Sequence, residues 1–149
     1  MDKNICRLVN RYVKKFDTRN PFEIAERLGI EYQIGDLGSS WGCYIYLKKH
    51  RCIFINENLS DDDMIQVMAH ELGHALLHRT QNCYFIRNKT FLLESRIEKE
   101  ANLFAANLLI PDDVLYEARE QEYTINQVAR LTKCSDLLVS LRLIDESLV

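Results

Sequence analysis

The segment MAHELGHALLH at residues 68–78 decides the fold and suggests the chemistry. Its apolar positions recur with the period of a helix, which is predicted to extend from about 61 to 78. His70 and His74 are four residues apart, so both imidazoles lie on one face of that helix, about one turn apart. Both rings can then bind one zinc ion at about 2.0–2.1 Å, and Glu71 between them can accept a proton from a water at the metal. The pattern is typical of zinc-dependent peptide hydrolysis.

The segments around this helix indicate the fold class. Alternating apolar residues predict strands at 30–34, 44–47 and 52–55, the last two forming a hairpin that turns at 48–51, with Trp41 and Gly42 in a loop before it. Helical periods predict helices at 5–16, 21–29, 94–109, 111–120, 124–131 and 135–143, and a polar loop at 79–89. We therefore expect an α+β fold, namely a mostly helical, zincin-like domain with a small three-stranded antiparallel sheet ahead of the active-site helix.

The length of 149 residues fits a single metallopeptidase domain, with a catalytic core at about 1–120 and a helical tail at about 121–149. The net charge of -3 argues against nucleic acid or an anionic membrane as the main partner. No apolar run approaches the roughly 18 residues of a membrane-spanning helix, and residues 1–16 contain charges throughout instead of a signal-peptide core. We expect a cytoplasmic protein. The five cysteines form no C-x-x-C pair, so a thiolate zinc site has no support.

A catalytic zinc ion needs a third protein ligand besides the two histidines. His78 continues the spacing of four, but three such imidazoles span about 12 Å of helix axis, too far for one ion. We therefore expect His78 to have a structural role or to support a ligand from behind. His50 falls at the predicted hairpin turn and is most simply a surface residue.

The predicted helix at 94–109 offers Glu94, Glu98 and Glu100 as the third ligand. Glu98 is followed by Ala101 and Asn102, which resembles the E-x-x-small-Asp/Asn pattern of gluzincins. In such proteins the glutamate binds zinc and the residue one turn later bonds the outer nitrogen of a ligating histidine. This resemblance favours Glu98 as the ligand and Asn102 as its supporting residue. Glu100 points about 200° away around the helix, so it is the alternative to Glu98 and not an additional ligand.

The chain resembles the ImmA/IrrE family of metallopeptidases. The segments that carry this resemblance are MAHELGHALLH at 68–78 and EKEANLFAANLLIP at 98–111, with a weaker match that includes TINQVARLTKCS at 124–135. The resemblance implies His70, His74 and Glu98 as Zn²⁺ ligands and Glu71 as the general acid and base. It also implies a substrate, a helix-turn-helix transcriptional repressor that is cleaved to derepress a phage-like or mobile-element operon.

Two other functions remain open on the sequence. The same fold could act as a non-cleaving antagonist that binds the repressor, although Glu71 would then have no use. The tail from Thr124 resembles a helix-turn-helix fragment and could bind DNA, but few basic residues occur there, so a bundle that closes the domain or docks a partner is preferred. Tyr84 and Tyr123 are both conceivable stabilisers of an oxyanion, and the spacing selects neither.

Overall fold

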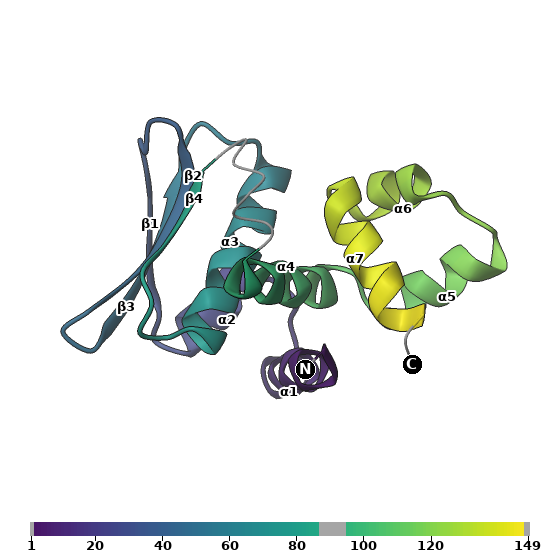
Figure 1. The fold of residues 1–149 in the computed structure, drawn as a ribbon, viewed down its shortest axis with the longest axis horizontal. Coiled ribbons are helices and arrows are strands. Elements are labelled where there is room, and N and C mark those ends of the chain that lie inside the picture. Colours follow the sequence, from purple (N-terminus) through teal and green to yellow (C-terminus); the bar gives the residue numbers. More distant parts are fainter. Residues whose placement is uncertain (1, 87–94, 148–149) are drawn as a thin grey trace.

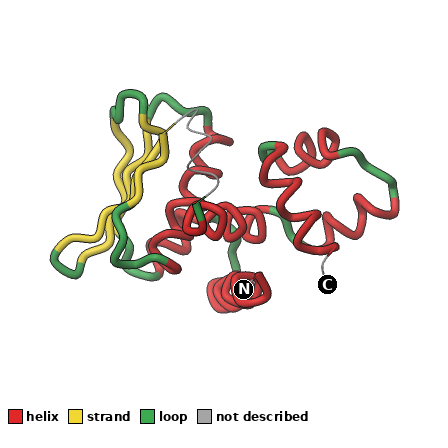
Figure 2. The backbone as a smooth tube through the Cα atoms, viewed as in Figure 1, coloured by secondary structure: helices red, strands yellow, loops and turns green. Residues whose placement is uncertain are grey.

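The computed structural model describes residues 2–86 and 95–147. The described helices are α1 (Asp2–Phe16), α2 (Pro21–Arg27), α3 (Asp61–Leu77), α4 (Arg96–Leu109), α5 (Asp112–Glu120), α6 (Ile125–Thr132) and α7 (Asp136–Ser147). The described strands are β1 (Glu31–Gly35), β2 (Ser40–Leu47), β3 (His50–Asn56) and β4 (Cys83–Ile86). The helices lie to one side of the sheet, and the C-terminal helices extend furthest from it (Figures 1 and 2). The α+β, mostly helical class expected from the sequence is confirmed.

The sheet differs in detail from the three antiparallel strands expected. The described part of the chain forms four strands in the order β1-β3-β2-β4, and β1 runs parallel to β3. The extra strand β4 comes from the segment predicted as a loop, and it pairs antiparallel with β2. Trp41 and Gly42, also expected in a loop, belong to β2. Polar residues at 79–82 and 87–89 led the whole segment to be predicted as a loop, although the four residues of β4, Cys-Tyr-Phe-Ile, themselves favour a strand.

The β2–β3 hairpin turns through two residues, fewer than predicted. Lys48 and Lys49 both have positive φ, at 49° and 65°, as the central residues of a tight hairpin require. His50 and Arg51 have already joined β3, where they pair with Leu47 and Tyr46. His50 is exposed, as predicted.

Helix α3 forms the centre of the molecule. Its N-terminus is capped by Ser60, whose side chain accepts a hydrogen bond from Asp63 N at 3.2 Å, and three aspartates occupy the first turn. The run 67–75 is buried throughout, because β2 and β3 pack on one side of α3 and α4 packs on another. A helix buried on several sides lacks a polar face there, so the polar residues in this run need a specific reason to be present.

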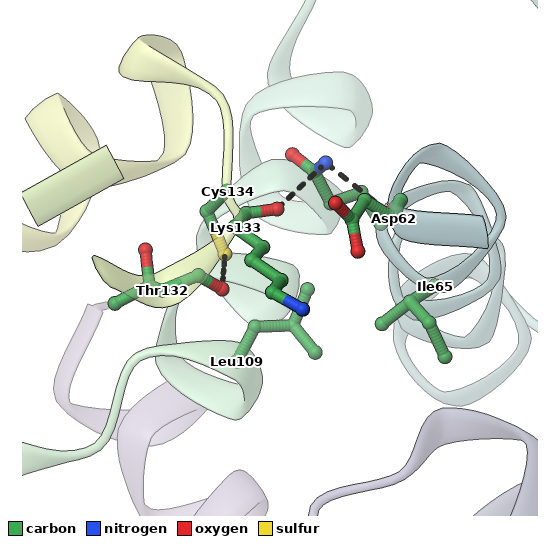
Figure 3. Close-up of a pocket in the computed structure, with 7 residues that line it drawn as sticks. Asp62, Ile65, Leu109, Thr132, Lys133 and Cys134 are labelled. Atoms are coloured by element: carbon green, nitrogen blue, oxygen red, sulfur yellow. Dashed lines mark hydrogen bonds between the residues drawn. The ribbon is translucent and has the colours of Figure 1, made fainter. Parts of the chain in front are cut away.

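The C-terminal helices pack back onto this centre. Helix α7 packs against α4, and Arg142 donates from Nε to the carbonyl oxygen of Ile110 at 2.9 Å while pairing with Asp112. Gln66 on α3 contacts the α6–α7 turn: its Nε2 donates to Lys133 O at 3.3 Å, and its Oε1 accepts from Ser135 N at 2.7 Å. Gln66 and Lys133 line an open pocket there, together with Asp62, Ile65, Leu109, Thr132 and Cys134 (Figure 3). Within the described residues, none of the helices combines the length and apolar character that crossing a membrane requires.

Candidate metal centre

Two imidazoles from α3 form one side of the candidate site. His70 and His74 are 3% and 0% exposed, and their rings stand nearly perpendicular with centroids 4.8 Å apart. Their Nε2 atoms are 3.2 Å apart. The helical spacing predicted from the sequence therefore brings these two nitrogens together inside the protein.

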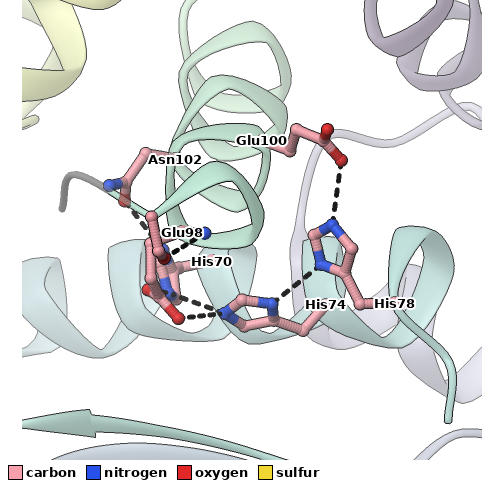
Figure 4. Close-up of polar contacts among 7 residues, drawn as sticks. His70, His74, His78, Glu98, Glu100 and Asn102 are labelled. Carbon is pink, nitrogen blue, oxygen red and sulfur yellow. Dashed lines mark hydrogen bonds and ion pairs between the residues drawn. The ribbon is translucent and has the colours of Figure 1, made fainter. Parts of the chain in front are cut away.

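Glu98 approaches the imidazoles from α4. Ser95 caps this helix by accepting from Glu98 N at 3.3 Å, which places Glu98 in the first turn. Its Oε2 lies 2.9 Å from His70 Nε2, and its Oε1 lies 3.0 Å from His74 Nε2 (Figure 4). Helix α4 can come this close because Gly73 has no side chain, since a Cβ there would lie 3.2 Å from the backbone of Ala101. The glycine of the motif is thus part of how the site is built.

The three groups match the donor set and dimensions of a tetrahedral zinc site. Bonds of about 2.0–2.1 Å in a tetrahedral site place ligand atoms about 3.3 Å apart. The observed separations among His70, His74 and Glu98 are 2.9, 3.0 and 3.2 Å. Among the residues that the structure describes, this is the only group of three or more histidine, cysteine or acidic side chains close enough to hold an ion. Two imidazoles and one carboxylate are the protein ligands of a well-known class of catalytic zinc sites.

Asn102 supports His70 from behind. Its Oδ1 lies 2.7 Å from His70 Nδ1, so that nitrogen donates and the opposite nitrogen, Nε2, is the one directed at Glu98. This contact is the one that the gluzincin resemblance implied for Asn102. A hydrogen bond at the outer nitrogen fixes both the ring orientation and the tautomer of a metal-ligating histidine.

The electrostatics of the cluster favour a cation. Burial raises the pKa of Glu98, but hydrogen bonds and charge from His70 and His74 outweigh burial and bring that pKa to about 2, so Glu98 is ionised. Burial lowers the pKa of His74, which opposes placing a proton on this ring. When Nδ1 rather than Nε2 carries the ring proton, as the contact with Asn102 favours for His70, the Nε2 lone pairs and the carboxylate repel one another unless a cation lies between them. A divalent ion between them would make all three contacts attractive.

Glu71 is the second buried carboxylate and is left without a partner. It is 0% exposed, and within the described part of the chain neither of its oxygens has a hydrogen-bond partner. Burial, and then the charge of Glu98, raise its pKa well above the ordinary value. Strand β2 lies directly over it, since a Cβ on Gly42 would lie 3.5 Å from Glu71 Cγ. A buried, unpartnered carboxylate beside a cluster of this kind is characteristic of a functional site rather than a stabilising one.

The remaining sequence candidates lie outside the three-residue cluster. Glu100, the alternative third ligand, contacts His78 instead, with Oε2 2.9 Å from His78 Nε2. Sequence reasoning missed this pairing because it joins residues on two helices, and no local pattern links them. Tyr123 lies in the turn between α5 and α6, while the side chain of Tyr84 and the whole of Glu94 lie outside the described residues.

The chain is similar to known proteins over most of its length. Residues 25–143 match the family described as the IrrE N-terminal-like domain. The chain is 38% identical over 122 residues to the uncharacterized immunity region protein 2 of Bacillus phage phi105, covering 81% of this chain and 77% of that protein. It is 36% identical over 118 residues to the metallopeptidase ImmA of Bacillus subtilis strain 168, covering 78% of this chain and 69% of that protein.

The matched region contains the whole candidate site, from His70 on α3 to Asn102 on α4. Two relatives above one-third identity also match most of the chain. The chain therefore belongs to the ImmA/IrrE family of metallopeptidases.

Proposed function

We propose that this protein is a zinc-dependent endopeptidase in which His70, His74 and Glu98 hold the metal and Glu71 transfers protons. One observation carries the proposal: three side chains converge through contacts of 2.9–3.2 Å between their ligand atoms, and a buried carboxylate without a partner follows directly after the first ligand in the sequence. Membership of a metallopeptidase family supports it.

The chemistry follows from the side chains present. A bound zinc ion would supply Lewis acidity, lowering the pKa of a water toward about 7 and polarising a peptide carbonyl. Glu71 would accept a proton from the attacking water and deliver it to the leaving amine. Its burial raises its proton affinity, which suits a group that must take up a proton before releasing it. Asn102 would keep His70 in the tautomer that presents Nε2 to the metal.

The proposed substrate is a helix-turn-helix transcriptional repressor whose cleavage derepresses a phage-like or mobile-element operon. One relative is named a phage immunity region protein and another a metallopeptidase, and these two names together favour a protein substrate of this kind. We place the reaction in the cytoplasm, with no direct contact to nucleic acid or membrane. The net charge of -3 accords with this assignment.

The test combines the purified protein with the repressor encoded beside its gene, with added zinc or with a chelator. Cleavage is expected only with the metal and intact Glu71, and Glu71→Gln is expected to lose at least about 100-fold in rate, since general acid–base catalysis contributes about 10²–10⁴. Glu117→Gln is the matched control. Because Glu117 is exposed on α5, this variant should cleave the repressor at the wild-type rate. If Glu71→Gln derepressed the operon as well as the wild type, the protein would be a binding antagonist instead.

A further inference from the structure

A chain of polar contacts continues from the cluster to the protein surface on the side away from Asn102. His74 Nδ1 lies 3.0 Å from His78 Nδ1, and His78 Nε2 lies 2.9 Å from Glu100 Oε2 (Figure 4). The other oxygen of Glu100 accepts from Arg96 Nε at 2.8 Å. None of these contacts is required to bring the three ligands together, so this series of polar contacts needs its own explanation.

The end of α3 makes this arrangement possible. His78 is the C-cap residue, with φ of -128° and ψ of 47°, and its backbone N–H bonds to His74 O at 2.7 Å. Because His78 has left the helical conformation, its ring turns back onto the outer nitrogen of His74 (Figure 4). His78 is 7% exposed, so water does not readily replace this contact.

The direction of the hydrogen bonds can be read from Glu100 inward. Arg96 Nε donates to one oxygen of Glu100 at 2.8 Å and His78 Nε2 lies 2.9 Å from the other, and a carboxylate paired with a guanidinium accepts only. His78 Nε2 must then donate to it. In a neutral ring His78 Nδ1 is the acceptor, so His74 Nδ1 donates. His74 Nε2 is left with its lone pair, directed at Glu98.

We propose that His78 and Glu100 form a positioning pair that holds His74 in the Nδ1–H tautomer, with Nε2 turned toward the metal. The pair does for His74 what Asn102 does for His70. Helix α4 thereby contributes three residues to the site. Glu98 is a ligand, and Glu100 and Asn102 support the two ligands on α3. This inference rests on the proposed metal site, and its test must distinguish the two.

The test measures zinc affinity of the full chain by competition with a colorimetric chelator. Loss of a residue that orients a ligand typically costs about 10–100-fold in metal affinity, and we expect this for His78→Ala and Glu100→Ala. Arg96→Ala removes the outer contact of Glu100 and leaves the contact between Glu100 and His78, so its zinc affinity should stay within about threefold of the wild type. His50→Ala is the matched histidine control, because His50 is exposed in β3 and should not change the affinity.

Two conservative variants separate orientation from simple packing. In His78→Asn the amide oxygen falls near the position of Nδ1 and can still accept from His74, so most of the affinity should return. In His78→Gln the amide moves outward toward the position of Nε2, so the loss should persist. Urea unfolding of each metal-free variant checks that it is folded. If His78→Ala does not fold, the comparison of Glu100→Ala with His78→Asn still tests the inference.

Combining the changes tests whether the two residues act as a pair. The double variant His78→Ala/Glu100→Ala should lose no more affinity than the worse single variant. Additive losses, or single variants within twofold of the wild type, would overturn the inference while leaving the zinc site intact. A wild-type chain that binds no zinc would instead contradict the proposed function.

Discussion

Gly73→Ala perturbs the close contact between α3 and α4 on which the candidate site depends. A Cβ at Gly73 would lie 3.2 Å from both Cα and O of Ala101 and 3.2 Å from Phe104 Cβ. Two of these three atoms are backbone, so rotating a side chain cannot relieve the crowding. The two helices would have to move apart by a few tenths of an ångström, and α4 carries Glu98.

The expected cost can be worked from these contacts. Overpacking a tight interior typically costs about 1–3 kcal/mol. Replacing a helical glycine by alanine returns about 1 kcal/mol, which leaves a net destabilisation of up to about 2 kcal/mol. In a domain of this size that corresponds to a fall in Tm of up to about 8 °C. Zinc affinity should fall as well, because the separation of Glu98 from His70 and His74 changes with that of the helices.

Urea unfolding of the metal-free protein measures the loss of stability, and competition with a chelator measures the loss of zinc affinity. Gly35→Ala is the control, since a Cβ at Gly35 meets nothing within 4 Å. A Gly73→Ala protein that gained about 1 kcal/mol, as an unobstructed helix position does, and bound zinc like the wild type would refute the argument.

Two further changes probe the strand and the carboxylate next to the cluster. Gly42→Ala would place a Cβ 2.7 Å from Val67 Cγ1 and 3.0 Å from Phe54 O. It should therefore lower the free energy of unfolding in urea by about 1–3 kcal/mol. Equal stability of Gly42→Ala and Gly35→Ala would contradict this packing. Glu71 has its pKa raised on folding, so its contribution to the stability of the metal-free protein is lost as pH rises from about 4.5 through its folded pKa. Glu71→Gln should therefore gain stability over the wild type progressively above about pH 4.5 in chelator, and a gap that narrows with rising pH would refute the raised pKa.

The sequence predicted the helices of the site well because their signals are local. The apolar period around His70 and His74, the Ser60 cap and the acidic first turn all indicate α3, and the structure begins that helix at Asp61. The proline at 111 marks the end of α4, which stops at Leu109. Likewise, the angular separation of Glu98 and Glu100 along one helix correctly indicated that only one of them faces the two imidazoles.

Features that depend on pairing between distant segments escaped prediction. Strand β3 lies between β1 and β2 and runs parallel to β1, where the sequence predicted an antiparallel sheet. The contact between His78 and Glu100 joins the end of α3 to α4 and depends on His78 leaving the helix. Gly42 read as a loop residue because its close approach to Glu71 exists only once the sheet packs on α3.

The zinc content of the loaded and desalted protein, measured by mass spectrometry of the metal, tests the central claim most directly. One zinc per chain is expected in the wild type, and Glu98→Ala should lose most of it. Glu100→Ala should keep its zinc through desalting, because its weaker binding still leaves all three ligands in place. A wild-type chain without stoichiometric zinc, or a Glu98→Ala chain that keeps it as firmly as the wild type, would contradict the account.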